Sequence, residues 1–338
     1  MEKNGLQLIN KYRSAIMGVA ALWILIFHEW QPIAEDVWSI YVVEKAIKRL
    51  GFGGVDIFFF LSGIGLVYAI KKYDVKTFYK RRIVNIYIPF LITAIAMAFL
   101  QEWEVLEFFK NVLFINFYTE TIYCFLWFMP AIFTFYLLFP WYYRIFEKTV
   151  NKVQFTALLL LIWLLISVLL RDVMRHDLYG FTNRIPIFIV GILTGWVLQE
   201  REVIFTRLTW GICVCAFVLG LYFGYLTNYE DYFLVVPTSN CCIPNFLMAI
   251  SGSCLLARFF LFADMRLKMF GKGILKLLGF IGSISLELYC VEEWIGNRMR
   301  TVLDLESKLV LNVIVFVSII CCAFVLHMIC KLIKKVIP

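Results

Sequence analysis

The stretch GFGGVDIFFFLSGIGLVYAI, residues Gly51 to Ile70, is apolar over a length that crosses a lipid bilayer as a helix. It carries one carboxylic acid, Asp56, near its start. A lone carboxylate is costly in hydrocarbon, so an acid inside such a segment indicates a functional site. His28 lies near the end of the preceding apolar stretch, Ser14 to Trp30. Together, His28 and Asp56 favour chemistry within a membrane over a soluble fold.

The composition agrees with a membrane protein. The chain has 338 residues, of which 62% are hydrophobic and 17% charged, and its mean hydropathy is +0.83. Soluble domains are only about half apolar. The formal net charge of +8 comes from basic residues that flank the apolar stretches. Because topology determinants are placed in this way, the charge does not indicate a nucleic-acid partner, and none is expected.

The chain contains ten stretches that we interpret as transmembrane helices. They are residues 14–30, 51–70, 83–100, 124–143, 155–170, 186–198, 210–226, 246–262, 277–295 and 309–330. An even number of spans puts both termini on one side, and about two thirds of the 32 Lys and Arg residues fall in the loops of that side. The positive-inside rule therefore places both termini in the cytoplasm. We predict an all-α polytopic membrane helical bundle that forms a single domain over residues 1–338.

Two further features are read from the residue pattern. Residues 106–118 form an amphipathic segment, which we interpret as an interfacial helix. Most of the ten cysteines lie inside apolar runs, and no CxxC pair is present. A free cysteine in such a run acts as a small apolar side chain, so we expect neither a metal site nor a disulfide framework.

The predicted topology brings three ionisable residues to a similar depth in the outer leaflet. His28 lies about 22 Å above Arg13 at 1.5 Å per residue, Asp56 lies just below the outer end of the second span, and Glu292 ends the ninth. A histidine beside a carboxylate forms a general base that can deprotonate a hydroxyl attacking an acyl carbonyl. The alternatives are an interfacial histidine, a structural ion pair of Asp56 with an arginine, and a solvated helix end at Glu292 and Glu293.

Basic residues gather at the cytoplasmic ends of the first and third predicted spans. Arg13 opens the first, and Arg81 and Arg82 open the third. Guanidinium groups bind phosphate oxygens at two points, so these three arginines are candidates for holding a phosphorylated substrate. The alternative is that they only fix topology or contact anionic lipid.

The order of several motifs resembles the membrane-bound acyltransferase 3 family. The stretches that carry the likeness are RSAIMGVAALWILIFH at 13–28, GGVDIFFFLSG at 53–63, the Arg81-Arg82 turn followed by Pro89, LWFMPAIFTFYLLFP at 126–140, NRIPIFIVGIL at 183–193 and SLELYCVEEW at 285–294. The likeness spans nearly the whole chain, and the second motif is the most specific.

The resemblance implies a ten-helix enzyme of the bacterial cytoplasmic membrane. Such an enzyme takes an acyl group, usually acetyl, from cytoplasmic acyl-CoA and transfers it to a hydroxyl of an exported or cell-surface carbohydrate. By position, Arg13 and His28 match the Arg and His of the family's first helix, Asp56 matches the acid of its second helix, and Arg81 and Arg82 match its basic turn. The ninth-helix motif of the family often ends in His, where this chain has Glu292.

We therefore expect a membrane O-acyltransferase with catalytic residues His28, Asp56 and Glu292, and with Arg13, Arg81 and Arg82 binding the acyl-CoA donor. In this expectation Asp56 orients His28, which deprotonates the acceptor hydroxyl. Its partners are the bilayer, acyl-CoA and a carbohydrate acceptor. One alternative is a transporter or flippase that uses the histidine and the aspartate as a proton relay. The other is a non-catalytic membrane partner in an envelope assembly complex. Consumption of acyl-CoA separates the enzyme from both alternatives.

Overall fold

The computed structural model describes residues 4–119, 124–170, 179–229, 239–303 and 305–336. Within these residues the chain is helical, apart from turns and one isolated bridge between Gly5 and Ile204, which confirms the all-α prediction. The helices group into two compact units. The first unit comprises Met1–Phe58, Arg201–Tyr232 and Ile243–Pro338, and the second comprises Phe59–Glu200 and Phe233–Cys242. A single domain over residues 1–338 stays a prediction.

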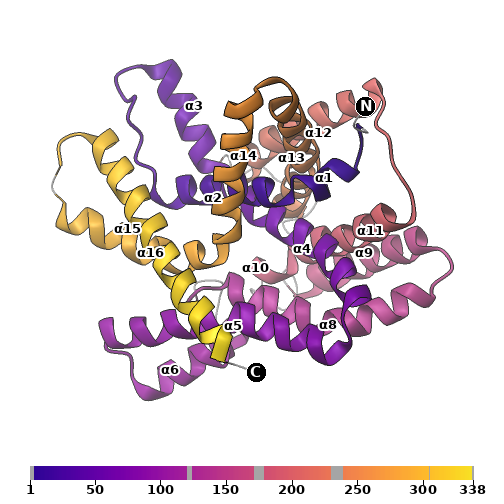
Figure 1. Ribbon diagram of the computed structural model, residues 1–338, viewed down its shortest axis with the longest axis horizontal. Coiled ribbons are helices and arrows are strands. Elements are labelled where there is room, and N and C mark those ends of the chain that lie inside the picture. Colours follow the sequence, from indigo (N-terminus) through magenta and orange to yellow (C-terminus); the bar gives the residue numbers. More distant parts are fainter. Residues whose placement is uncertain (1–3, 120–123, 171–178, 230–238, 304, 337–338) are drawn as a thin grey trace. The chain divides into compact units, whose positions relative to one another are not determined.

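The first unit is organised around α2 (Arg13–Glu29). The short α1 (Gln7–Lys11) precedes α2, and α3 (Trp38–Arg49) follows it and packs on it. α14 (Lys268–Ser283), α15 (Ser285–Val302) and α16 (Lys308–Val336) also contact α2, and Figure 1 shows α15 and α16 side by side. The rest of this unit is α12 (Arg207–Tyr229), most of α13 (Ser239–Arg266) and the first turns of α4 (Gly53–Lys72).

The second unit holds the remainder of α4 and a series of apolar helices. These are α5 (Val75–Leu100), α6 (Val105–Val112), α7 (Ile115–Thr119), α8 (Phe128–Lys148), α9 (Lys152–Val168), α10 (Tyr179–Thr182) and α11 (Ile185–Glu200). α5 packs on α8, and α9 on α11. Aromatic rings fill the interior, where the Phe135 ring stacks on Phe188 with centroids 4.4 Å apart.

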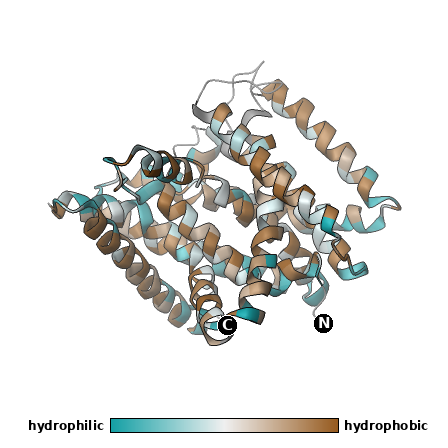
Figure 2. Ribbon diagram, turned by 90° about the horizontal axis from the view of Figure 1, so that it is seen from above, coloured by the Kyte–Doolittle hydropathy of each residue, from teal (hydrophilic) through white to brown (hydrophobic). Residues whose placement is uncertain are grey.

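Within the part of the chain that the structure describes, five helical segments are long and apolar enough to cross a membrane. They are α4, α5, Arg207–Thr227 of α12, Cys242–Arg266 of α13, and α16, and α14 with α15 makes a sixth if counted as one broken span. A helix covers most of each of the ten predicted stretches. Figure 2 shows hydrophobic residues along most helices, with hydrophilic residues mainly at their ends. Ten spans and cytoplasmic termini remain predictions.

The ninth predicted span is not one continuous helix. α14 and α15 meet at Ile284 with a bend of 74°. Beside the break, the Ser283 hydroxyl donates to the Phe280 carbonyl at 2.7 Å and the Ser285 hydroxyl donates to the Gly282 carbonyl at 3.0 Å. Serine hydroxyls that bond to carbonyls of the preceding turn compete with the helical hydrogen bonds, which explains why an apolar run breaks here.

α2 and α14 approach each other closely where two glycines meet. A Cβ atom added at Gly18 would lie 2.0 Å from the carbonyl oxygen of Leu278, and one added at Gly282 would lie 2.0 Å from that of Ser14. Small residues allow the backbones of membrane helices to pack in this way. This contact fixes α14, and through the bend at Ile284 the start of α15, against α2.

The connection after the first predicted span is not an irregular loop. It contains α3, an amphipathic helix without a buried residue, on which Trp38, Ile40, Val43 and Ile47 are exposed. The predicted interfacial segment at residues 106–118 corresponds to α6 and α7. Exposed apolar side chains on a charged short helix are typical of segments that lie along a membrane surface.

Candidate functional site

The last turn of α2 and the middle of α15 bring His28 and Glu292 together. Nδ1 of His28 lies 2.9 Å from Oε1 of Glu292. Glu292 is 1% exposed, whereas the His28 side chain is 33% exposed. The interpretation of Glu292 as a solvated helix end is therefore wrong, although its neighbour Glu293 is exposed. A buried carboxylate thus contacts a histidine whose side chain is partly exposed.

This geometry suits proton transfer. If the carboxylate of Glu292 accepts the proton on Nδ1, the neutral imidazole carries a lone pair on Nε2. The His28 ring also packs against Phe27, with centroids 5.0 Å apart, which restricts its orientation. A histidine that is fixed in one tautomer by a carboxylate is the usual form of a general base.

Beside this pair, Glu29 and Arg300 form a second connection between α2 and α15. Glu29 is 2% exposed, and its Oε2 accepts a hydrogen bond from Nη1 of Arg300. The carboxylate rests on Gly296, where an added Cβ would lie 2.0 Å from Oε2. Glu292, Gly296 and Arg300 are spaced by four residues, so they share one face of α15. That face holds α15 against the end of α2. The Glu29–Arg300 pair was not predicted from the sequence.

Asp56 is buried, with 1% of its surface exposed, but the structure gives it another partner than the expected one. Its Oδ2 accepts a hydrogen bond from Nδ2 of Asn245 at 2.9 Å, and the carboxylate on Nδ1 of His28 is that of Glu292. The orientation of His28 by Asp56 is thus corrected to orientation by Glu292.

The reason is the rotation of α4 about its own axis. Gly54 faces α2, because a Cβ there would lie 2.7 Å from the carbonyl oxygen of Ala20. Two residues along a helix correspond to a turn of about 200° at 3.6 residues per turn, so Asp56 points towards α13 instead. Asp56 lies in the first turn of α4, where the helix dipole favours a negative charge. Its catalytic role stays a prediction.

A second His–Glu pair connects α15 with α16. Nδ1 of His327 lies 2.9 Å from Oε1 of Glu287, whose side chain is 6% exposed. Near the start of α16, the side chain of Asn312 donates a hydrogen bond to the carbonyl of Gln31 at 2.7 Å and accepts one from the N–H of Gln31 at 3.0 Å. Neither contact was predicted from the sequence, in which residues 309–330 form one apolar stretch. Two residues of α15, Glu287 and Glu292, thus each hold one histidine.

Arg13 lies at the opposite end of α2 from His28. It is the first residue of the helix, so the two Cα positions are separated by about 22 Å along the axis. The predicted contact between Arg13 and the acyl-CoA donor would therefore lie at the end of α2 that is remote from His28. This role stays a prediction.

Arg81 and Arg82 lie near the start of α5 in the second unit. Nη1 of Arg81 donates to the Tyr73 hydroxyl at 2.6 Å, and its guanidinium lies 4.2 Å from the centroid of the same ring. The Arg82 guanidinium lies 5.2 Å from the centroid of Tyr136. Such contacts orient a guanidinium group without neutralising it, so both groups keep their charge for an anion. Their binding of acyl-CoA stays a prediction.

Among the described residues, no group of three or more His, Cys, Asp and Glu side chains is placed to hold a metal ion.

Comparison with protein families gives one match. The family model described as an acyltransferase domain matches residues 15–329 of the chain. Comparisons with curated proteins and with solved structures gave no match. The family match and the apolar helices together indicate a multi-pass membrane protein with an acyltransferase type of function. Because the match covers far more than half of the 338 residues, the chain belongs to the acyltransferase 3 family.

Proposed function

We propose that this protein is an O-acyltransferase of the bacterial cytoplasmic membrane. It moves an acetyl group from acetyl-CoA to a hydroxyl of an exported or cell-surface carbohydrate. The observation that carries the proposal is the hydrogen bond from Nδ1 of the partly exposed His28 to the buried carboxylate of Glu292. In a member of an acyltransferase family, this pair supplies the base that the transfer of an acyl group to a hydroxyl needs.

The proposed reaction uses the pair first to take up a proton and then to return it. Nε2 of His28 takes the proton from the acceptor hydroxyl while the hydroxyl oxygen attacks the carbonyl carbon of the thioester. The tetrahedral intermediate then breaks its C–S bond, and the leaving sulfur takes the proton back from His28. The products are the acylated carbohydrate and CoA with a free thiol, and His28 returns to its neutral form. Glu292 stabilises the imidazolium that exists between the two proton transfers.

The arginines complete the proposal on the donor side. CoA carries several phosphate groups, and guanidinium groups bind phosphate in two-point fashion. We assign Arg81 and Arg82 to these phosphates, because both guanidinium groups are oriented by aromatic rings at the start of α5. Arg13, at the start of α2, is assigned to the same donor. No metal ion is needed for any of these steps.

The test uses membranes that contain the protein, radiolabelled acetyl-CoA and the cell-surface carbohydrate of the same cells. We expect label to enter the carbohydrate, with one CoA thiol released for each acetyl group transferred. His28→Ala should lower the rate by about 10²–10⁴-fold, the usual contribution of a general base. Glu292→Gln should lower it as well, whereas Glu293→Gln is the matched control at the exposed neighbouring position.

Two outcomes would contradict the proposal. One is acetyl incorporation at the wild-type rate in both the His28 and the Glu292 variants, provided that each variant reaches the membrane in normal amount. The other is transport of a glycolipid by the protein with no release of CoA thiol, which would favour a transporter.

A further inference from the structure

The end of α2 that carries His28 is fixed by contacts with three other helices. After Glu29 the backbone leaves the helical conformation. Glu44 of α3 and Asn312 of α16 bind the chain beyond this point. Arg300 of α15 binds Glu29 itself. The three contacts differ in how fully their polar groups are satisfied, and this difference sets Arg300 apart.

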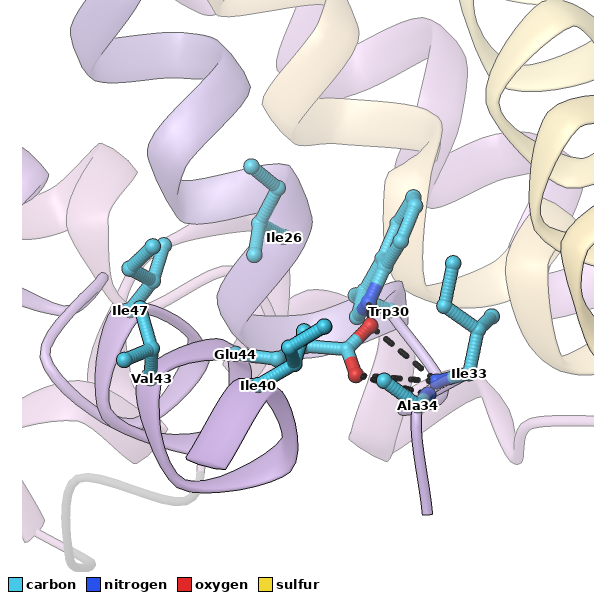
Figure 3. Close-up of a pocket in the computed structure, with 8 residues that line it drawn as sticks. All are labelled: Ile26, Trp30, Ile33, Ala34, Ile40, Val43, Glu44 and Ile47. Atoms are coloured by element: carbon cyan, nitrogen blue, oxygen red, sulfur yellow. Dashed lines mark hydrogen bonds between the residues drawn. The ribbon is translucent and has the colours of Figure 1, made fainter. Parts of the chain in front are cut away.

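Glu44 satisfies the donors of the connection between α2 and α3. It accepts hydrogen bonds from Nε1 of Trp30 at 2.6 Å, from the N–H of Ile33 at 3.0 Å and from the N–H of Ala34 at 3.2 Å. Figure 3 shows the carboxylate turned towards these three donors. Partial burial acts to raise the pKa of Glu44, but these hydrogen bonds outweigh it and the pKa is lowered. The contact of Glu44 is thus explained by the backbone that it holds.

Asn312 is satisfied in the same way. Its side-chain amide bonds to both the N–H and the carbonyl of Gln31, and its exposed fraction is 0%. A buried amide that donates and accepts in this manner stabilises the backbone that it binds.

Arg300 is satisfied much less completely. Its Nη1 donates to Oε2 of Glu29, but its Nε and Nη2 are buried and have no hydrogen-bond partner among the described residues. Buried donors without an acceptor cost stability. Apolar side chains in place of a buried ion pair are often no less stable. The hydrogen bonds of Arg300 therefore do not explain why a cation occupies this position.

Two buried carboxylates lie close together beside His28. The Glu29 carboxylate rests on Gly296, which lies one helical turn, about 6 Å, from Glu292 on the same face of α15. Glu29 and Glu292 are 2% and 1% exposed, so solvent screens their mutual repulsion only weakly. Among the described residues, Arg300 is the one arginine or lysine in an ion pair with either of them.

We propose that Arg300 is a positioning residue for the proposed reaction. By neutralising Glu29, it keeps the Glu292 carboxylate on Nδ1 of His28. Without the guanidinium charge, the carboxylates of Glu29 and Glu292 repel each other and Glu292 is displaced from the histidine. Arg300 acts mainly through its charge, since it makes a single hydrogen bond here. This inference rests on the proposed function, in which the His28–Glu292 pair transfers the proton of the acceptor hydroxyl.

The first measurement is the rate of acetyl transfer in membranes that contain each variant. Arg300→Gln should lower kcat by about 10–100-fold with little change in KM, as expected for an uncompensated unit charge at about 6 Å and an effective dielectric constant of about 20. Arg300→Lys should keep most of the rate, because lysine retains the charge. Arg298→Gln is the matched control, since Arg298 is an exposed cation of the same helix.

A double variant separates the effect of charge from simple structural support. When Glu29→Gln is combined with Arg300→Gln, both charges are absent and no second carboxylate repels Glu292. Most of the wild-type rate should then return. If Arg300 only held α15 in place, the double variant would be as slow as Arg300→Gln or slower.

A spectroscopic measurement that needs no acyl-CoA separates this inference from the proposed function. The chain has three histidines, so ¹⁵N labelling of histidine gives a simple NMR spectrum, in which His28→Gln identifies the signals of His28. In the wild type we expect the tautomer with the proton on Nδ1, because that atom faces Glu292. Arg300→Gln should lose this single-tautomer signal, and the double variant should regain it.

The inference is overturned if Arg300→Lys is as slow as Arg300→Gln, or if the double variant regains neither the rate nor the tautomer. If Arg300→Gln does not accumulate in the membrane, Arg300→Lys and the double variant still decide. Both should keep most of the wild-type rate, and a rate as low as that of His28→Gln in either would overturn the inference. A wild-type rate for His28→Gln would contradict the proposed function, and the tautomer of His28 would then decide the positioning role alone.

Discussion

Replacing Gly296 by alanine tests how α15 is held at the end of α2. The new Cβ would lie 2.0 Å from Oε2 and 2.2 Å from Cδ of Glu29. Nonbonded carbon and oxygen atoms do not approach below 3.0 Å, so the carboxylate has to retreat by about 1 Å. Glu29 is buried and bonded to Arg300, so this retreat strains the ion pair. We expect a loss of about 1–3 kcal/mol of stability, as for other overpacked sites.

Thermal unfolding of the purified protein, followed by the reaction of a fluorescent dye with newly exposed cysteines, measures this effect. Cys254, Cys290 and Cys330 are buried cysteines, whose exposure to the dye reports unfolding. Gly279→Ala is the matched control, because a Cβ at Gly279 meets nothing within 4 Å.

A double-mutant cycle then identifies the cause. Glu29→Ala alone should cost about 3–5 kcal/mol, because it leaves Arg300 as a buried charge without its partner. In that background the carboxylate is gone, so Gly296→Ala should cost nothing further. The reasoning is refuted if Gly296→Ala is as stable as Gly279→Ala, or if its cost is the same with and without Glu29.

Three further changes have defined outcomes. Gly282→Ala places a Cβ 2.0 Å from the backbone oxygen of Ser14, and no side-chain rotation relieves this overlap. The variant should therefore unfold at a lower temperature. An unaltered melting temperature would contradict the close contact between α2 and α14. Asp56→Leu removes the hydrogen-bond acceptor of the buried Asn245 amide and should lower the stability by about 1–3 kcal/mol. The same melting assay measures this loss. An unchanged melting temperature would show that the hydrogen bond contributes little. The pKa of Glu44 lies below its ordinary value of 4.5, so the ionised carboxylate stabilises the fold above pH 4.5, and this contribution is lost as the pH falls through the lower folded-state pKa. In that pH range, protease cleavage within α3 should rise in the wild type. Glu44→Gln should show no such transition.

The helix positions were largely predictable because each apolar stretch repeats the same composition over a sufficient length. The break in the ninth stretch was not, since Ile284 is as apolar as its neighbours and the signal lies only in the flanking Ser283 and Ser285. α3 was missed for a related reason. Its apolar residues remain exposed, so it lacks the continuous hydrophobic run that marks a span.

The residues of the candidate pair, His28 and Glu292, were selected from the sequence, but the contact between them was not predicted. Both were selected because ionisable residues are rare in such helices. The partner of His28 depends on how each helix is rotated, and in α4 that rotation is set by Gly54 against α2. A glycine contact of this kind cannot be read from one sequence. The Glu29–Arg300 pair was hidden because both residues lie at helix ends, where solvated charges are expected.

The most direct measurement is the acetyl-transfer rate of four proteins: the wild type, His28→Gln, Glu292→Gln and the double variant. Residues that act as one unit have strongly non-additive effects. If Glu292 acts only by orienting His28 and stabilising its charged form, the double variant should be no slower than His28→Gln alone. Independent effects that multiply in the double variant, or a wild-type rate for Glu292→Gln, would contradict a catalytic pair built from α2 and α15.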